Sequence, residues 1–451
     1  MFEALYTTEE MKAAETAYAG TVEELMERAG RAVAEAGLEL YGDARRWTVV
    51  RGGGANGGDG RIAARELERA GREVHVVEAR EEHELGRPDV IVDGLFGTGF
   101  SGVPRPDAAA LIERINASGA KVVAVDLPSG VDASTGEVAG AVVDADVTVT
   151  FHGPKIGAVV APGRFHAGEV RLADIGLAPV ATEARLVRPS LLDSVPRRGD
   201  RDNKYTAGHV LVVGGSPGLT GAPSLTAMAA LRADAGYVTL AAPESTLPVF
   251  EQRLLEVVKR PLPDDLGELA AKASALAIGP GLGRDDRARA LVRRALAELP
   301  LPAVVDADAL FGLEPAEWPA PRVLTPHEGE LGRLLGRPSA EVAAHRVAAV
   351  REAAERFGCV VLLKGPDTLV AAPGRGLLVS SLGLPSLATA GTGDVLTGIV
   401  GAFLAKGMDA QVAAAAGAAV QQLASVAAEH RAGMVASDLI AALPRVLDAP
   451  V

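Results

Sequence analysis

The sequence of 451 residues has a single cysteine, Cys359, inside the apolar run from 359 to 363. One cysteine provides neither an intrachain disulfide nor a thiolate zinc site, so we interpret Cys359 as a core thiol. Clusters of basic residues are also lacking: none is longer than the pair Arg197-Arg198, and the net charge is −13. These features argue against a nucleic-acid partner and favour small-molecule chemistry.

The sequence also lacks the patterns of a signal peptide and of a membrane span. Residues 1–15 are charged and have no apolar core, which indicates a cytoplasmic protein. The most lipid-like stretch, from Val412 to Ala428, is rich in alanine and contains Gln421 and Gln422. Because alanine contributes little to membrane insertion, we interpret this stretch as a buried helix and expect no membrane partner.

The apolar residues that are present suffice for two domains. They make up 48% of the chain, and 451 residues exceed what one hydrophobic core usually serves. In the first half, helical patterns alternate with short apolar runs, which predicts an α/β fold with a mainly parallel sheet and helices on both faces. We expect two helices within 8–40, further helices at 62–70 and 108–117, and strands at 47–50, 74–77, 90–92, 122–125 and 145–150.

Three of these strands run into polar clusters. Asn56 and Asp59 lie in the glycine-rich segment 51–60, which is expected to be a loop between the first strand and a helix. Such a loop brings backbone amides up to a phosphate, although the segment is neither a P-loop nor a Rossmann fingerprint. The third strand is followed by 93–99 and the fourth by 126–132. Ligands of parallel sheets bind beyond the carboxyl ends of strands, so we expect one site here rather than three unrelated turns.

A charged segment with several prolines, 178–203, indicates a linker, and the alternation restarts behind it. Lys364 is notable in this second half, because the chain has only eight lysines and this one follows a buried strand. Strands are expected at 210–213, 237–241, 275–278, 303–305, 323–324 and 360–363, with a glycine loop at 214–222 and a helix at 225–235. Polar or glycine-rich signals follow four of these strands, at 279–283, 306–308, 325–330 and 364–368.

The segment Ala390–Asp394 precedes residues with helical spacing, so a buried helix is expected from about Asp394. Small residues before it present backbone amides at the helix N-terminus, which makes an anion site with a carboxylate beside it. We expect the helix N-terminus to lower the pKa of Asp394 and to leave it ionised, as a weak base. The simpler alternative is an N-cap aspartate after a glycine turn.

With these residues, the chain resembles the bacterial bifunctional NAD(P)H-hydrate repair enzymes, in which an epimerase domain precedes an ADP-dependent dehydratase domain. In the first half the likeness rests on 56–60, 97–99, 126–132 and Pro154-Lys155. It implies a Rossmann-like, doubly wound epimerase domain over residues 1–195 and a ribokinase-like α/β dehydratase domain over 196–451. It also implies that the R and S forms of hydrated NADH and NADPH are interconverted, and that the S form is dehydrated at the expense of ADP.

For the epimerase domain, the resemblance implies that Asn56, Asp93 and Ser129 hold a potassium ion. These three offer only oxygen ligands and one formal negative charge, which suits a monovalent cation. Asp126 would be the acid–base group of a reaction that proceeds by ring opening or by loss of the hydroxyl through an iminium. The family usually has Asn where this chain has Ala55, so one side-chain contact to the substrate is expected to be missing. The residues implied to bind the hydrate are Ala55, Asn56, Gly57, Gly58, Asp59, Gly97, Thr98, Gly99, Phe100, Ser101, Gly102, Val103 and Asp126.

For the dehydratase domain, dehydration is helped if the hydroxyl is first phosphorylated, because hydroxide is a poor leaving group. Asp394 would accept the hydroxyl proton, while Lys364 and the Gly391–Gly393 amides stabilise the transferring phosphoryl group. Magnesium is expected with the nucleotide phosphates, with Asp306 contributing through water. The choice between ADP and ATP is open. The resemblance implies that Ala222, Gly283, His327 and Asp394 contact the hydrate and that Lys364, Gly365, Pro366, Asp367, Thr368 and Gly393 hold the nucleotide.

Two alternatives are open. A ribokinase-like kinase of a small molecule such as a vitamin alcohol, fused to a non-catalytic binding domain, would explain Gly391–Asp394 but leave the first half unexplained. The first half could also be only a binding or assembly module, against which its three polar strand ends argue. We further expect a homo-oligomer, whose size the sequence leaves open, as it does the preference between NADH and NADPH hydrates.

Overall fold

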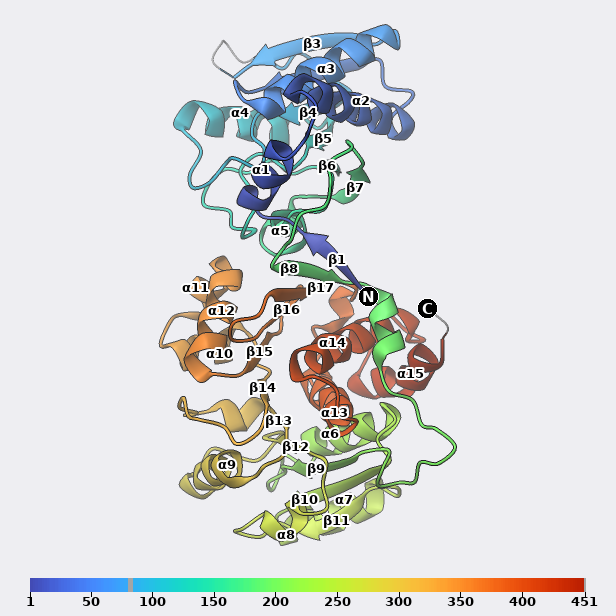
Figure 1. The fold of residues 1–451 in the computed structure, drawn as a ribbon, viewed down its shortest axis with the longest axis vertical. Helices are drawn as coiled ribbons and strands as arrows, with labels where there is room; N and C mark the ends of the chain where they lie inside the picture. Colours follow the sequence, from blue (N-terminus) through green and yellow to red (C-terminus); the bar gives the residue numbers. More distant parts are fainter. Residues whose placement is uncertain (80–83, 450–451) are drawn as a thin grey trace. The chain divides into compact units, whose positions relative to one another are not determined.

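The computed structural model describes residues 1–79 and 84–449, which fold as two compact units (Figure 1). The N-terminal unit comprises residues 4–184, and the C-terminal unit combines residues 1–3 with the described residues from Arg185 onward. The chain therefore leaves the C-terminal unit within its first strand and returns to it after Ala184. The boundary expected after residue 195 lies further along the chain.

The N-terminal unit is a parallel sheet covered by helices. Its strands follow the spatial order β3-β2-β4-β5-β6-β7, and neighbouring strands are parallel throughout. The expected elements are present, and β7 is an additional strand that the sequence pattern did not suggest. The strands are β2 (Arg46–Arg51), β3 (Glu73–Glu78), β4 (Val90–Gly94), β5 (Lys121–Val125), β6 (Val147–Phe151) and β7 (Glu169–Ala173). The helices are α1 (Thr8–Thr16), α2 (Val22–Leu40), α3 (Ala55–Arg69), α4 (Pro106–Ala117) and α5 (Ile156–Val159).

Both faces of this sheet are apolar. Trp47 and Val49 of β2 belong to a core shared with α2 and α3, whereas Val50 of the same strand belongs to a core shared with α4. Successive side chains of a strand point to opposite faces, so a strand that helices cover on both sides needs an unbroken apolar run. The predicted α/β class, with helices on both faces of a parallel sheet, is confirmed.

The strand order reverses between β2 and β4, because β3 lies on the other side of β2. In an open α/β sheet, such a switch point forms a crevice at the carboxyl ends of the strands. The expected loop over 51–60 is wrong here, since α3 begins at Ala55 and Asn56 to Gly60 form its first turns. The glycines serve close packing, because a Cβ at Gly57 would overlap the carbonyl oxygen of Gly52.

The C-terminal unit is built on a larger mixed sheet of 11 strands in the order β1-β8-β17-β16-β15-β14-β13-β12-β9-β10-β11. From β11 to β15 neighbouring strands are parallel, whereas β16 pairs antiparallel with β15 and β17. The antiparallel part was not expected from the sequence. The strands are β1 (Phe2–Leu5), β8 (Ala184–Val187), β9 (His209–Val213), β10 (Tyr237–Ala242), β11 (Val258–Pro261), β12 (Ala275–Ile278), β13 (Ala303–Val305), β14 (Arg322–Leu324), β15 (Val360–Leu363), β16 (Thr368–Ala371) and β17 (Leu377–Ser380).

Helices lie on both sides of this sheet. Figure 1 shows α9 to α12 on one side and α6, α13, α14 and α15 on the other. The second group forms one hydrophobic core with the sheet. The helices are α6 (Gly221–Arg232), α7 (Leu247–Arg253), α8 (Gly267–Ala270), α9 (Asp286–Glu298), α10 (Glu328–Leu335), α11 (Ser339–Ala344), α12 (Arg346–Phe357), α13 (Thr392–Ala405), α14 (Ala410–Ala427) and α15 (Ala436–Asp448).

The helical spacing predicted after Ala390 is confirmed in α13. Val395, Ile399 and Phe403 are fully buried, and the helix begins at Thr392, slightly before the expected residue. Its N-cap is Gly391, whose φ of 89° favours a residue without a Cβ. The alanine-rich helix α14 is buried, as interpreted, and over the described ranges no helix is long and apolar enough to cross a membrane.

Candidate active sites

The switch point of the N-terminal unit brings together Asn56, Asp93 and Ser129. Asn56 lies in the first turn of α3, Asp93 near the end of β4, and Ser129 in the turn after β5. Ser129 donates two hydrogen bonds to the Asp93 carboxylate, from Oγ at 2.7 Å and from its backbone N at 2.9 Å. Asn56 Nδ2 donates to the carbonyl oxygens of Phe96, 2.7 Å away, and Val125, 3.0 Å away. The three residues therefore meet at one edge of the sheet, as the sequence predicted.

Asp93 is a fully buried carboxylate whose charge is only partly compensated. Burial raises the pKa of Asp93 to about 6, and hydrogen bonds from Ser129 and Leu95 offset part of the rise. Within the part of the chain that the structure describes, no cationic side chain pairs with Asp93 and no donor reaches Asn56 Oδ1. Oxygen donors with one formal charge suit a monovalent cation better than calcium or magnesium. The residues present therefore fit the expected potassium ion.

Asp126, the expected acid–base residue, has a strained backbone. Its φ of 66° lies in the left-handed region, which is costly for a residue with a Cβ and recurs at functional sites. Its Oδ1 accepts hydrogen bonds from Thr150 Oγ1 at 3.0 Å, from Phe151 N at 3.3 Å and from Lys155 Nζ. Its Oδ2 accepts none from any described residue. One carboxylate oxygen is thus fixed, and the other is left for a ligand.

Lys155 is a residue to which the sequence analysis gave no role. It directly precedes α5 and is fully buried. Its ammonium donates to Asp126 Oδ1, to Thr150 Oγ1 at 3.1 Å and to the Phe151 carbonyl at 2.8 Å. Because its three N–H donors are all used, Lys155 holds Asp126 rather than a substrate. The signal that could have found it is the one that pointed to Lys364: a scarce lysine just beyond an apolar strand.

Asp59 lies further into α3 and differs electrostatically from Asp126. Burial, and then the negative charges of Asp126 and Glu15, raise the pKa of Asp59 to about 8, although the charge of Lys155 opposes the rise. Asp59 therefore carries a proton at neutral pH. The resemblance treated it only as part of the hydrate-binding run.

The other residues expected to bind the hydrate form two segments beside Asn56. Residues 55–58 are the start of α3, and the segment 97–103 follows β4. The residues of the second segment are partly or fully exposed. Gly97 packs closely against Asn56, since a Cβ there would lie 2.7 Å from Oδ1. Both segments thus lie at the carboxyl ends of β2 and β4.

The C-terminal unit has its own switch point between β9 and β12, because β10 lies on the other side of β9. Ala222 lies in the first turn of α6, which begins at Gly221 rather than at the expected residue 225. Gly283 follows β12, and its backbone N donates to Asp308 Oδ2 at 3.0 Å. Two residues expected to contact the hydrate therefore follow the two strands of the switch point.

Lys364 follows β15 and pairs with Asp306, which follows β13. Lys364 Nζ donates to Asp306 Oδ1 at 2.8 Å, and Thr397 Oγ1 donates to Asp306 Oδ2 at 2.7 Å. Burial acts to lower the pKa of Lys364, but the carboxylates of Asp306 and Glu330 raise it above its ordinary value. Lys364 is therefore a fixed positive charge. Gly393 allows α13 to approach it, since a Cβ there would lie 3.3 Å from Lys364 Nζ.

Asp394 lies in the first turn of α13, and its electrostatics correct the sequence-based expectation. Burial raises the pKa of Asp394 to about 7, and the Asp306 carboxylate adds to the rise against the charge of Lys364. The predicted lowering of this pKa is therefore wrong. Loss of hydration and neighbouring carboxylates outweigh the helix dipole. Asp394 is therefore only partly ionised at neutral pH, and its ionised form is a stronger base than expected.

His327 is the N-cap residue of α10. Its Nδ1 accepts hydrogen bonds from the backbone N of Gly329 at 2.9 Å and of Glu330 at 3.4 Å, and the Glu330 carboxylate accepts from His327 N at 2.9 Å. This reciprocal pair is a capping box. Because Nδ1 acts as an acceptor, the ring proton of a neutral His327 lies on Nε2. The side chain is 55% exposed, so this donor is accessible.

The nucleotide-binding run expected after β15 has an exposed and a buried part. Gly365-Pro366 is exposed. Asp367 is buried against Arg346, whose Nη2 donates to the Asp367 carbonyl at 2.8 Å and lies 3.4 Å from Oδ2. Thr368 begins β16, and its hydroxyl accepts from Gln422 Nε2 at 3.2 Å. Gly365-Pro366 is thus exposed, whereas the side chains of Asp367 and Thr368 are committed to the fold.

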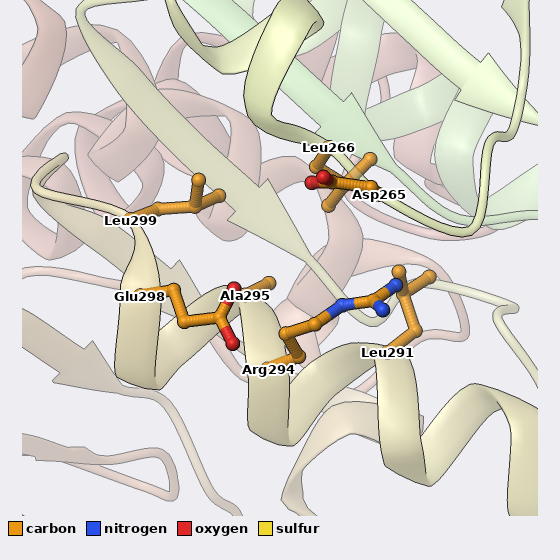
Figure 2. Close-up of a pocket in the computed structure, with 7 residues that line it drawn as sticks. All are labelled: Asp265, Leu266, Leu291, Arg294, Ala295, Glu298 and Leu299. Atoms are coloured by element: carbon orange, nitrogen blue, oxygen red, sulfur yellow. The ribbon is translucent and has the colours of Figure 1, made fainter.

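The pocket shown in Figure 2 is a separate feature between α9 and the segment before α8. Its cavity volume of about 10 Å³ has room for about one water molecule, which excludes a dinucleotide. The pocket lies on the half of α9 that leads to the start of β13, away from the carboxyl ends of the strands. It is lined by Asp265, Leu266, Leu291, Arg294, Ala295, Glu298 and Leu299.

Comparison with known proteins matches both halves of the chain. A family model described as NAD(P)H-hydrate dehydratase matches residues 210–445, and one described as YjeF-related protein N-terminus matches 22–87 and 77–157. The bifunctional NAD(P)H-hydrate repair enzyme Nnr of Moorella thermoacetica is 39% identical over 94% of this chain and 92% of its own. The enzyme of the same name from Escherichia coli (strain K12) is 35% identical over 96% of this chain and 90% of its own.

Solved structures match a little over half of the chain. The ADP/ATP-dependent NAD(P)H-hydrate dehydratase from Bacillus subtilis, co-crystallized with ATP and Mg²⁺, is 29% identical with a TM-score of 0.51, covering 57% of this chain and 94% of that one. A ribokinase-like superfamily protein from Enterococcus faecalis V583, 23% identical with a TM-score of 0.53 over 60% of this chain and 97% of its own, shares the fold. The fold and sites thus define an α/β enzyme built of two units. The chain belongs to the family of bifunctional NAD(P)H-hydrate repair enzymes.

Proposed function

We propose that the chain carries both activities of its family, one in each half. Residues 1–195 interconvert the R and S forms of hydrated NADH and NADPH. Residues 196–451 dehydrate the S form at the expense of ADP, with AMP and phosphate as the other products. The observation that carries this proposal is that each unit has its own site with a carboxylate beside a lysine: Asp126 with Lys155, and Asp394 near Lys364.

In the dehydratase site, Asp394 accepts the proton of the hydrate hydroxyl while the hydroxyl oxygen attacks the β-phosphorus of ADP. Lys364 and the Gly391–Gly393 amides stabilise the charge on the transferring phosphoryl group. Phosphate then leaves with the carbon–oxygen bonding pair while the ring nitrogen supplies electrons, and the released phosphate takes the ring proton whose loss restores the double bond of the reduced nicotinamide. A pKa of Asp394 of about 7 supports this role, because the group is partly ionised at neutral pH and still basic.

Magnesium is expected to enter this site with the nucleotide, as the ATP and Mg²⁺ in the Bacillus subtilis structure suggest. Both oxygens of Asp306 already accept hydrogen bonds, one from Lys364 and one from Thr397. This carboxylate would therefore contribute through water rather than as a direct ligand. The ion would neutralise part of the phosphate charge, with the phosphates as its main ligands.

In the epimerase site, Asp126 is the acid–base group, and the free Oδ2 supports that assignment. Potassium held by Asn56, Asp93 and Ser129 would stabilise the start of α3 and screen the phosphates of the hydrate. Ring opening of the hydrate, or loss of its hydroxyl through an iminium, exchanges the configuration without a nucleotide. Residues 55–59 and 97–103 would bind the hydrate around this centre.

The proposal is tested by incubating the protein with both hydrate epimers, with and without ADP and magnesium, and following the absorbance of reduced nicotinamide. Complete conversion is expected only with ADP, with AMP and inorganic phosphate formed in equal amounts. An Asp126→Ala variant should convert the S share and then stop, apart from slow spontaneous epimerisation. A stable phosphorylated product in place of inorganic phosphate would instead favour a ribokinase-like kinase of a small molecule.

The cytoplasmic location and the homo-oligomeric state stay predictions from the sequence. The preference between NADH and NADPH hydrates is open as well, and competition between the two hydrates in the same assay would measure it.

A further inference from the structure

Asp59 is about as buried as Asp126, but the hydrogen-bond partners of the two carboxyls differ. It is 7% exposed, and its carboxyl receives no hydrogen bond from a residue in the ranges 1–79 and 84–449. Asp126, by contrast, has three donors on Oδ1, one of which is the Lys155 ammonium. The Asp59 carboxyl oxygens are not among the described side-chain atoms that are both sealed from solvent and without a partner, so a ligand can reach them and supply a hydrogen bond.

The charged groups that face Asp59 come from three elements. They are Glu15 on α1, Asp126 after β5 and Lys155 before α5. From α2 the contact is made by Gly30, where a Cβ would lie 2.5 Å from the Asp59 carbonyl oxygen, and this contact adds no charge. Burial, together with two carboxylates against one ammonium, raises the pKa of Asp59, so that Asp59 keeps its proton, whereas Asp126 Oδ1 accepts a hydrogen bond from Lys155.

We propose that Asp59 is the proton donor that works with Asp126 as the proton acceptor in epimerisation, and that Lys155 is the residue that positions Asp126. This inference rests on the proposed epimerase function and adds a second proton-transfer group to it. The protein supplies the two groups from different elements: α3 carries the acid, and the end of β5 carries the base.

The proton balance fits ring opening. Asp126 Oδ2 takes the hydroxyl proton, the carbon–oxygen bond becomes a carbonyl, and the carbon–nitrogen bond breaks with its electron pair on nitrogen, which takes the Asp59 proton. Rotation of the aldehyde turns its other face to the nitrogen. On closure Asp59 takes back the proton of the nitrogen, and Asp126 returns its proton to the oxygen. Both carboxyls thus end each turnover in their starting states.

The iminium route lacks this property. There Asp59 protonates the leaving hydroxyl, and a water that adds to the opposite face gives its proton to Asp126. The turnover would end with a neutral Asp126 beside Lys155 and with an ionised Asp59 that has no partner among the described residues. Burial disfavours such an unpaired charge, so the arrangement favours ring opening.

The first test is Asp59→Asn in the full-length chain, with the exposed Asp43→Asn as the matched control. Epimerisation is measured without ADP by the rate at which R and S forms equilibrate above the uncatalysed rate. A donor role predicts that kcat falls at least about a hundredfold in Asp59→Asn with little change in KM. The control should keep wild-type rates, and thermal melting and ADP-dependent dehydration check the fold.

The pH profile separates a proton donor from a structural or binding residue. The pKa of Asp59, raised to about 8, predicts that kcat/KM of the wild type falls above that pH. The residual activity of Asp59→Asn should lack this fall. In Glu15→Gln the fall should move to lower pH, because removal of one facing negative charge lowers the pKa of Asp59.

The outcomes can be told apart. If the wild type equilibrates the epimers no faster than buffer, the proposed function itself fails. If the wild type is active but Asp59→Asn keeps its kcat, or keeps the fall at high pH, Asp59 is not the donor. Epimerisation in ¹⁸O-labelled water should proceed with less than one oxygen exchanged per event, whereas one label per event would overturn the ring-opening step.

Discussion

The ammonium of Lys364 lies 2.8 Å from the carboxylate of Asp306, at the ends of two strands between which β14 runs. Thr397 of α13 donates to the other oxygen of Asp306, so this pair also ties the helix to the sheet. The Asp306 charge acts on Asp394 in the first turn of that helix. This ion pair thus holds the Lys364 ammonium in place for a phosphoryl group, and its carboxylate helps to raise the basicity of Asp394.

Asp394→Asn should abolish ADP-dependent dehydration and leave epimerisation intact. The variant keeps the size of the side chain but cannot accept the hydroxyl proton. Because general-base catalysis contributes about a hundredfold or more to a rate, the dehydration rate should fall by at least that factor. The measurement is kcat for dehydration of the S form, alongside R and S equilibration without ADP. The matched control is the exposed Asp286→Asn on α9. A dehydration rate within about tenfold of wild type, a loss below ~1.4 kcal/mol, would show that Asp394 is not the base.

The dehydration rate should depend on pH around neutrality. Asp394 must be ionised to accept a proton, and its pKa is raised to about 7 by burial and by Asp306. Because protonation removes the base, kcat/KM falls as the pH drops below 7, and it is about tenfold lower one unit below the pKa of Asp394 than at high pH. In Asp306→Asn the fall should move to lower pH, because one negative charge near Asp394 is gone. An unchanged midpoint in that variant would contradict the electrostatic explanation.

Much of this arrangement could be predicted from the sequence. Apolar runs alternating with helical patterns specify a parallel sheet, and the carboxyl ends of parallel strands meet at one edge. That rule alone brings Asn56, Asp93 and Ser129 together. The start of α3 was missed, because glycine has a low helix propensity and the close packing of Gly57 overrides it.

The electrostatics could not be predicted, since they depend on side chains far apart in the sequence. The pKa of Asp394 is set by its burial and by Asp306, neither of which a local pattern reveals. Lys155 acquires its role only because the chain folds back onto Asp126. In the sequence, Asp59 is one polar residue of a glycine-rich run, and only the fold shows that it is buried beside two other carboxylates.

Lys155→Met should destabilise the protein and reduce epimerisation. The ammonium is fully buried, and its loss leaves the Asp126 carboxylate without an ionic partner. Breaking a buried ion pair in this way typically costs about 3–5 kcal/mol. Thermal melting and R and S equilibration measure the two effects, while ADP-dependent dehydration serves as the internal reference.

The double variant Lys155→Met/Asp126→Asn distinguishes this explanation from a packing defect. Asparagine tolerates the positive φ of Asp126 and carries no charge. Stability should therefore recover relative to Lys155→Met, whereas epimerisation should fall from the reduced rate of Lys155→Met to none, because the base is gone. If the double variant is no more stable than the single one, the loss comes from packing rather than from an unpaired charge.

Potassium should stabilise the protein through Asp93. This carboxylate is fully buried, its pKa is raised to about 6, and no described cationic side chain pairs with it, so a bound cation would relieve the cost of burying its charge. We expect a higher Tm in KCl than in choline chloride at the same ionic strength and at pH 7.5. A binding heat should be measurable with KCl and absent with choline chloride. Asp93→Asn keeps the shape of the side chain but removes the charge, and should respond equally to the two salts. Asp43→Asn, far from the switch point, should retain the wild-type difference. Equal melting temperatures and no binding heat for the wild type in the two salts would rule the potassium site out.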